Sequence, residues 1–365
     1  MNKRLSLLAF FMLAGCSAQP VQLAEDTRKY THGVSIVETS VLWSEKSGEQ
    51  RKDGWTHDIY RKEIGESQFD TLVSNPEAQE PVSASSSAET RIITYEDGYN
   101  SNNNVSQRYK LYDGEWQLLH EGTLLDGGHS GHVASTPDHH VLFWSHGWVN
   151  GGGVNDLGSG KEVIVSTVSN EGEVLHELKL SQADDRDSWP MLAASGDNAL
   201  LVWQQFNEDA SKAALHFAIY DPAANELTVK PAELLPQVDF YIYSVSYVPA
   251  ANQYLVAAQT NKGATLLLLS TDGELLDQIN APRLVREAAP AIQGHTLVFP
   301  QLPADYFTVE ISDDQLQLNF SGSAGIDWGT AGTTGIFLEE RRAYFATLHR
   351  EGLQEVTIEL EGEVQ

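Results

Sequence analysis

Histidine, the side chain best suited to proton transfer near neutral pH, is concentrated in one short stretch of this chain. Five of the twelve histidines fall within eighteen residues: His129, His132, His139, His140 and His146. Their spacing matches none of the recurrent zinc motifs. We therefore expect a surface that binds a ligand or transfers protons, with no metal ion and no cofactor.

A glycine-rich loop follows these histidines, from Gly147 to Asp156. Its glycines permit positive φ angles and close approach of the backbone to a ligand, and Trp148 offers a flat ring for stacking. We expect further polar and aromatic side chains to line the same surface. The full candidate set for ligand binding is His129, His132, His146, Trp148, Asp187, Trp189, Arg286, Asp327 and Trp328.

The segment 188–234 shows which elements must carry these residues. It consists of short runs rich in valine, isoleucine, tyrosine and tryptophan, each closed by glycine, asparagine, aspartate or proline. Such runs are typical of β-strands joined by tight turns, and four in succession predict an up-and-down sheet. The sheet buries both faces only when copies stack on it, so its recurrence predicts a β-propeller. Trp43, Trp144 and Trp203 lie in such runs, and we expect them to pack between sheets.

Two sets of turns recur in step along the chain and indicate how many sheets it forms. Turns between third and fourth strands fall about 42 to 58 residues apart, within the span of propeller blades. No segment after residue 32 has a helical pattern, so the predicted fold class is all-β, with a single propeller. We predict seven four-stranded blades, with six as the alternative count, near residues 33–75, 83–125, 131–180, 188–234, 242–281, 288–320 and 333 to the end.

The seventh blade is short of an outer strand. Its last clear strand runs from Glu355 to Leu360, close to the end of the sequence. Unpaired sheet edges are a liability for a folded protein. We expect residues Pro20 to Val37 to supply the missing strand, so that the N-terminal strand closes the ring.

The N-terminus is organised like a secretory signal. Lys3 and Arg4 precede an apolar run from Leu5 to Leu13, and small residues follow. The sequence Leu13-Ala14-Gly15-Cys16 resembles the lipobox of bacterial lipoproteins, in which the cysteine becomes the lipidated first residue of the mature chain.

The lipobox resemblance implies a cellular address. Because a serine follows Cys16, it implies sorting to the outer membrane, with the folded domain in the periplasm or on the cell surface. We expect residues 1–15 to be the signal peptide, 16–32 the lipidated cysteine and a tether, and 33–365 the propeller domain. Cys16 is the only cysteine, so the mature chain has no disulfide and depends on packing for stability.

The charge of the chain excludes one class of partner. Fifty-one acidic residues against 23 basic ones give a formal net charge of -28 at pH 7. A surface of this kind repels the phosphates of nucleic acids and of anionic lipids. We therefore expect no nucleic-acid ligand and predict a protein or a glycan instead.

Two short motifs frame the histidine stretch: Gly128-His129-Ser130 and Trp144-Ser145-His146-Gly147. They are similar to motifs of the BNR-type propeller polysaccharide lyases, among them ulvan lyases, in which one histidine opens an inner strand and a second closes the next strand. The resemblance implies proton transfer on an acidic glycan. The next blade departs from that family, since Trp189 stands where a tyrosine is expected and Gln204 or Gln205 where an arginine is expected.

Two functions follow from these observations. The first is an envelope lipoprotein that acts as a scaffold and binds a protein or glycan through one face of its propeller. The alternative is a carbohydrate-active enzyme, a polysaccharide lyase or hydrolase, acting on an acidic surface or extracellular glycan. No arginine closes the strand beside the histidines to neutralise a uronate, so we favour binding without turnover. The histidine stretch could also be a polar rim with no ligand.

Overall fold

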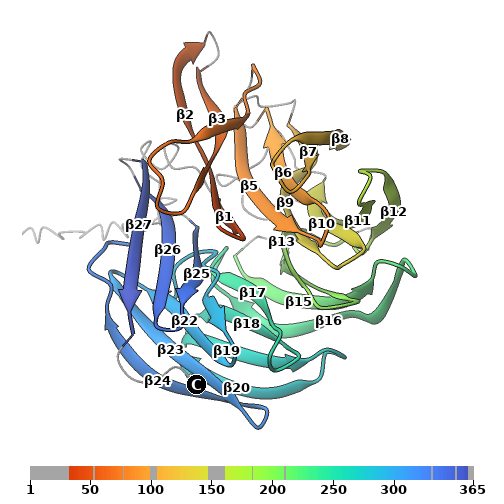
Figure 1. The fold of residues 1–365 in the computed structure, drawn as a ribbon. Helices are drawn as coiled ribbons and strands as arrows, with labels where there is room; N and C mark the ends of the chain where they lie inside the picture. The colour runs from red at the N-terminus through yellow and green to blue at the C-terminus, as the bar shows by residue number, and fades with distance from the viewer. Residues whose placement is uncertain are drawn as a thin grey trace, which may run out of the picture.

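Seven β-sheets follow one another along the chain and are arranged in a ring (Figure 1). Every regular element in the described residues is a β-strand, as the sequence predicted. No helix long and apolar enough to span a membrane occurs among the described residues. The computed structural model describes residues 33–51, 54–76, 78–98, 105–146, 161–182, 184–208, 211–329, 332–349 and 352–360.

The seven predicted blades are confirmed, and their boundaries lie within a few residues of those expected from the turns. The strands of blades 1 to 3 are β1 (Val34–Val37), β2 (Ser40–Arg51), β3 (Gly54–Glu63), β4 (Asp70–Val73), β5 (Gln79–Ser86), β6 (Arg91–Asp97), β7 (Ser106–Tyr112), β8 (Leu118–Asp126), β9 (His129–Ser135), β10 (His139–His146), β11 (Glu162–Ser169) and β12 (Val174–Lys179).

The remaining blades repeat the same plan. Their strands are β13 (Asp187–Ala194), β14 (Ala199–Phe206), β15 (Ala213–Asp221), β16 (Glu226–Val238), β17 (Tyr243–Val248), β18 (Gln253–Thr260), β19 (Gly263–Ser270), β20 (Leu275–Ala281), β21 (Ala291–Gln293), β22 (Thr296–Gln301), β23 (Asp305–Ser312), β24 (Gln315–Ser323), β25 (Thr333–Glu339), β26 (Arg342–His349) and β27 (Gly352–Glu359). In each sheet the strands keep chain order from the centre of the ring outward, and blade 7 has three strands within the described residues.

The start of the ring differs from the expectation. Val34–Val37 forms β1, which pairs with β2 as the first strand of blade 1, so this part of the predicted closing strand was misassigned. The reason is local: Glu38 adopts a positive φ of 55° in a two-residue turn that returns the chain as a hairpin. The rest of the expected closing segment, residues 20–32, lies outside the described residues, as do Cys16 and the signal segment 1–15.

Apolar side chains fill the spaces between neighbouring blades. Trp144 and Trp203 are fully or almost fully buried, and the ring of Trp203 meets that of Phe143 edge to face, at a centroid distance of 6.0 Å. Trp43 of blade 1 lies in the cluster between blades 1 and 7, where Tyr344 packs from blade 7. The predicted packing role of the three tryptophans is confirmed. Burial of each such side chain stabilises the fold by roughly 2–3 kcal/mol.

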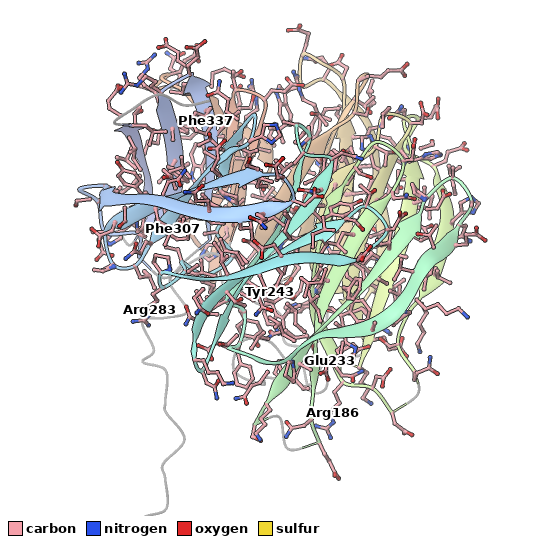
Figure 2. The ribbon with its side chains drawn as sticks, turned by 90° about the horizontal axis from the view of Figure 1, so that it is seen from below. Arg186, Glu233, Tyr243, Arg283, Phe307 and Phe337 are labelled. Atoms are coloured by element: carbon pink, nitrogen blue, oxygen red, sulfur yellow. The ribbon has the colours of Figure 1, made fainter. Side chains whose placement is uncertain are left out.

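The ring has two faces. We call the face at which the first strand of each blade begins the mouth face. The other face carries the turns between first and second strands, and we call it the turn face. In Figure 2, Arg186 and Arg283, which precede the first strands of blades 4 and 6, lie at the lower side. Phe337, near the end of the first strand of blade 7, lies at the upper side.

Candidate functional site

His129 is held at the mouth face by a neighbouring blade. Its Nδ1 lies 3.0 Å from Oε1 of Glu96, which ends the second strand of blade 2. The backbone N–H of Ser130 donates a hydrogen bond to the same oxygen at 2.6 Å. His129 and Glu96 are 4% and 1% exposed, so the imidazole is positioned by a buried carboxylate and is not a surface group.

Four consecutive blades have a strained residue at the entry to their first strand. Ser130, Trp189, Tyr241 and Glu287 adopt φ angles of 54°, 58°, 64° and 51° in blades 3 to 6. The left-handed region costs a residue with a side chain on the order of 1–3 kcal/mol, so it persists only where the surroundings enforce it. At each entry, the surrounding structure therefore holds the residue in a backbone conformation that it would not adopt by itself.

These entries bring an aromatic and charged group together, which we call the mouth cluster: His129, Trp189, Tyr241, Arg286 and Glu287. The ring of His129 meets that of Trp189 edge to face at a centroid distance of 6.4 Å, and Trp189 is in contact with Tyr241. The guanidinium carbon of Arg286 lies 4.9 Å from the centre of the Tyr241 ring, and its Nε lies 3.3 Å from a carboxylate oxygen of Glu287. A cation over an aromatic face is stabilised by the ring quadrupole.

Exposure differs within the mouth cluster. Trp189 and Tyr241 are 7% and 5% exposed, whereas the side chain of Arg286 is 20% exposed. The two aromatic rings are thus buried, and Arg286 is the most exposed member of the mouth cluster. The predicted site residues His129, Trp189 and Arg286 do come together.

Asp187, another predicted site residue, opens the first strand of blade 4. It is 1% exposed and accepts hydrogen bonds from Oγ of Ser181 at 2.6 Å and from Nε2 of Gln205 at 3.2 Å. Burial raises the pKa of its carboxyl group to about 6, because loss of hydration outweighs the two hydrogen bonds. Asp187 therefore supports the entry of blade 4 from inside and does not face a ligand directly.

His146 lies at the same edge of the blade 3 sheet as His129, as predicted, but does not join it. Ser145, not His146, is the residue directly opposite His129, because β9 contains a one-residue bulge between His129 and His132. A shift of one residue turns a side chain to the other face of a sheet. His146 packs instead beside Trp144, with its Nδ1 3.6 Å from Oε2 of Glu162.

Trp328 was placed in the candidate set incorrectly. Its side chain is fully buried between blades 6 and 7, where its ring lies 5.5 Å from that of Phe345 and its Nε1 donates to the carbonyl of Asp305 at 2.6 Å. Its role is packing, since a buried ring has no face for a ligand. The adjacent Asp327 is exposed and caps the backbone N–H of Gly329.

The other histidines of the stretch are dispersed by the strand geometry. His132 is half-buried on the first strand, and its Nδ1 has no hydrogen-bond partner among the described residues. His139 and His140 begin the second strand, at the turn face. Trp148 lies outside the described residues. The cluster seen in the sequence therefore resolves into groups at opposite ends of one sheet.

The contacts of the His129 imidazole at Nδ1 form neither a hydrolase triad nor a lyase pair with His146. In a hydrolase triad the acid contacts one imidazole nitrogen and the nucleophile the other. Here Glu96 and the hydroxyl of Ser130 both approach Nδ1, the latter at 2.8 Å. The lyase arrangement fails as well, because His129 and His146 point to opposite faces of the sheet. Within the described residues, no three metal-binding side chains gather to hold an ion.

Three residues at the mouth face were missed in the sequence, Glu96, Tyr241 and Glu287, although a signal for the first two existed. The second strand of several blades ends in an aromatic residue followed by a polar one, as in Tyr95-Glu96 and Trp203-Gln204. The polar residue bonds to the entry of the next blade: Oε1 of Gln204 accepts from the backbone N–H of Tyr241 at 3.1 Å. This repeated pair therefore marks both Glu96 and the entry that contains Tyr241.

The chain was compared with known families, curated proteins and solved structures. No family model matches it, and no curated protein is similar to it in sequence. A chain of the mitotic checkpoint complex is similar with a TM-score of 0.57 at 10% identity, over 92% of this chain and 91% of that one. The Dos1 propeller gives a TM-score of 0.52 at 11% identity, over 91% and 86% of the two chains.

An acylaminoacyl peptidase of Pyrococcus horikoshii is also similar, with a TM-score of 0.52 at 11% identity. It covers 92% of this chain, which corresponds to only 52% of the peptidase. Identities this low show a shared fold and nothing about activity. The chain is therefore a β-propeller.

Proposed function

We propose that this chain is an outer-membrane lipoprotein, anchored by a lipid on Cys16, whose propeller is a scaffold that binds a protein through its mouth face. The observation that supports the proposal most is the mouth cluster. Four consecutive blades accept strained entries, and three of these entries deliver Trp189, Tyr241 and Arg286 to one place. Strain of this kind concentrates at functional sites.

The chemistry of the mouth cluster suits a protein partner. Tryptophan, tyrosine and arginine are the residues that contribute most to binding energy at protein interfaces, particularly where they are rigid and mostly desolvated. Arg286 meets this description, because two aromatic rings and Glu287 hold its guanidinium in place. A preorganised side chain loses little entropy on binding.

The tether and the fold support the same function. A lipid on Cys16 followed by the polar segment 17–32 would hold the propeller near a membrane. A propeller of similar fold occurs in the mitotic checkpoint complex, which is an assembly. The enzymatic alternative receives no support from the geometry around His129.

Site-specific photocrosslinking in the lipidated, full-length protein tests the proposal. A crosslinking residue at the exposed Arg283, on the mouth face, should give a discrete covalent adduct in the native envelope. The same residue at the exposed Asp272, in the last turn of blade 5, should give none. Arg286→Ala should reduce the adduct from position 283 by about tenfold, as expected for a central interface arginine.

Two results would contradict the proposal. Equal adducts from positions 283 and 272 would show that the mouth face has no privileged partner. Release of an unsaturated uronide from an acidic polysaccharide, lost in His129→Ala, would instead establish the carbohydrate-active enzyme.

A further inference from the structure

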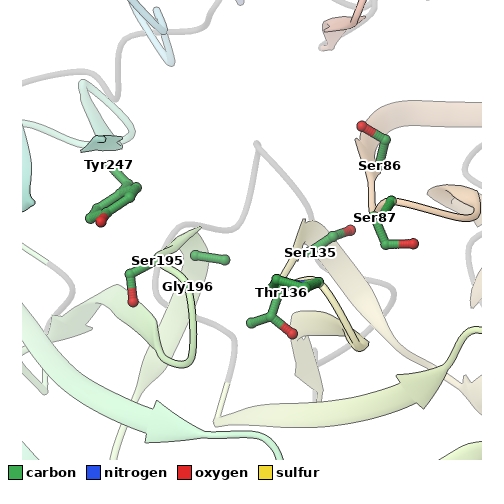
Figure 3. Close-up of a pocket in the computed structure, with 10 residues that line it drawn as sticks. Ser86, Ser87, Ser135, Thr136, Ser195, Gly196 and Tyr247 are labelled. Atoms are coloured by element: carbon green, nitrogen blue, oxygen red, sulfur yellow. The ribbon is translucent and has the colours of Figure 1, made fainter. Parts of the chain in front are cut away.

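The turn face carries a pocket that is separate from the mouth cluster. It has a volume of about 320 Å³ and is formed by segments 86–88, 135–137 and 194–196 together with Tyr247. The three segments are the turns between the first and second strands of blades 2, 3 and 4, and Tyr247 comes from the first strand of blade 5 (Figure 3). Six of the ten lining residues carry a hydroxyl group, and none is charged.

Three of the six hydroxyl groups that line this pocket donate their hydrogens to acceptors within the protein. Ser195 donates to the carbonyl of Asn198 at 3.1 Å, and Tyr247 donates to Oδ1 of Asn252 at 2.8 Å. Thr136 donates to the carbonyl of His139 at 3.2 Å. A hydroxyl has one hydrogen and two lone pairs, so a hydroxyl that has donated its hydrogen offers only acceptor capacity to a ligand.

A chain of hydrogen bonds links a fourth hydroxyl to a histidine. Oγ1 of Thr90 lies 3.1 Å from Oδ1 of Asn170 and 2.9 Å from Nε2 of His140. When Thr90 donates to Asn170, His140 carries its proton on Nε2, and Nδ1 accepts from the hydroxyl of Ser135, 2.7 Å away. Burial lowers the pKa of His140 to about 4, consistent with this neutral, single-proton form.

Carboxylates lie in the same turns as the residues that line the pocket. Glu89, Asp138 and Asp197 occupy the same three turns and are exposed. Within the described part of the chain they form no ion pairs, and the pocket lining contains no lysine or arginine. The site therefore combines hydroxyl acceptors with carboxylates in the same turns, which we call the acidic rim, on a protein with a formal net charge of -28. Such a field attracts cations and repels anions.

We propose that this pocket is a second binding site, which takes the cationic side chain of a lysine or arginine from a basic segment of a protein partner. An ammonium or guanidinium group has only donors, which match the acceptors of the lining. The rim carboxylates balance its charge. The site does not depend on the proposed mouth-face function, because it lies at the other end of the sheets.

Binding of a labelled peptide of alternating lysine and glycine to the full-length protein in detergent tests this proposal. Fluorescence anisotropy at physiological salt should show saturable binding, since screening removes most of the long-range attraction. A peptide with norleucine in place of lysine should bind at least about tenfold more weakly. Asp138→Asn combined with Asp197→Asn should weaken binding about three- to tenfold.

Gly196 offers a matched set of variants. It lines the pocket, its φ is not positive, and a Cβ there meets no atom within 4 Å, so side chains are tolerated. Gly196→Lys should place a tethered cation in the pocket and weaken peptide binding at least about tenfold. Gly196→Glu, of similar length, should leave binding intact or strengthen it. Gly114→Lys adds the same charge at another open turn and should have no effect beyond about twofold.

Several results would overturn the proposal. Equal losses for Gly196→Lys and Gly196→Glu would show that bulk, and not charge, governs the pocket. Equal binding of the lysine and norleucine peptides, or no saturable binding at all, would do the same. Arg286→Ala should leave peptide binding unchanged, so the two proposed sites succeed or fail separately.

Discussion

Ser130 and Glu96 belong to neighbouring blades, and the backbone N–H of Ser130 donates a 2.6 Å hydrogen bond to Oε1 of Glu96. The same oxygen lies 3.0 Å from Nδ1 of His129. One buried carboxylate oxygen thus connects blade 2 to the strained entry of blade 3. The contact is the counterpart of the bond between Gln204 and Tyr241 at the next interface but one.

This contact predicts a graded effect of two substitutions. Glu96→Ala leaves a buried N–H and the His129 imidazole without their acceptor and should lower the free energy of unfolding by about 2–4 kcal/mol. Glu96→Gln keeps an amide oxygen in the same place and should lower it by about 1 kcal/mol or less. Urea unfolding followed by tryptophan fluorescence measures both. Equal losses of unfolding free energy for the two variants would show that the acceptor oxygen at position 96 does not account for the stabilisation.

Asp187 should make the protein less stable as the pH rises. Its folded-state pKa of about 6 lies above the unfolded value, so the folded state binds the proton more tightly. The resulting stabilisation is full below about pH 4 and is lost as the pH rises through 6. Relative to the parent, Asp187→Asn should therefore gain up to about 3 kcal/mol between pH 4 and pH 7. Urea midpoints across this range test it, and a constant difference would refute the assignment.

His140 should act in the opposite direction. Burial lowers its pKa to about 4, below the unfolded value, so the folded state binds its proton less tightly. The stabilisation is present above about pH 6.5 and is lost as the pH falls through 4. His140→Gln keeps a donor and an acceptor but does not titrate. Its loss of stability on acidification should be smaller than that of the parent by roughly 2–3 kcal/mol, whereas identical acid profiles would contradict the argument.

Blade 7 lacks a fourth strand among the described residues, so the predicted ring closure can be tested directly. β27 has no outer neighbour within the described residues, and the chain enters β1 beside blade 7. Deletion of residues 20–32, which leaves β1 intact, should lower the melting temperature by about 5 °C or more if these residues add the fourth strand. A deletion of residues 361–365 is the control and should have little effect. A parent-like melting curve for the first deletion would show that the segment is only a tether.

Anchoring remains a prediction that rests on the lipobox. Cys16→Ser removes the thiol that would be acylated, so this variant should not incorporate a labelled fatty acid. It should appear in the soluble fraction with an unchanged circular dichroism spectrum, because Cys16 precedes the propeller. Persistence of the folded variant in the membrane fraction would contradict lipid anchoring.

The blades could be predicted from the sequence because their signals are local. Turn residues and apolar alternation act within a few residues, as in the hairpin that joins β13 and β14. Side-chain direction at a strand end depends on register, which a bulge changes. Without the extra residue in β9, His146 would lie opposite His129; with it, Ser145 does. No residue pattern in the local sequence predicts that bulge.

The errors at Trp328 and Tyr241 have a different origin. Whether an aromatic residue beside a strand faces solvent or core is decided by the neighbouring blade, which is distant in sequence. Trp328 meets Phe345 of blade 7, and Tyr241 meets Trp189 of blade 4. Contacts of this kind follow from the assembled ring and not from any single strand pattern.

The interface between blades 1 and 7 differs from the other six in its connectivity. Val41 and Trp43 pack there against Tyr344 and Leu348, and Lys62 forms an ion pair with Glu355 across it. At every other interface a connecting loop holds the two blades together even when their packing opens. At this seam the two blades lie at opposite ends of the propeller chain, and no loop within the described residues joins them. A covalent bond across this seam should therefore slow unfolding more than the same bond at an interface that a loop already connects.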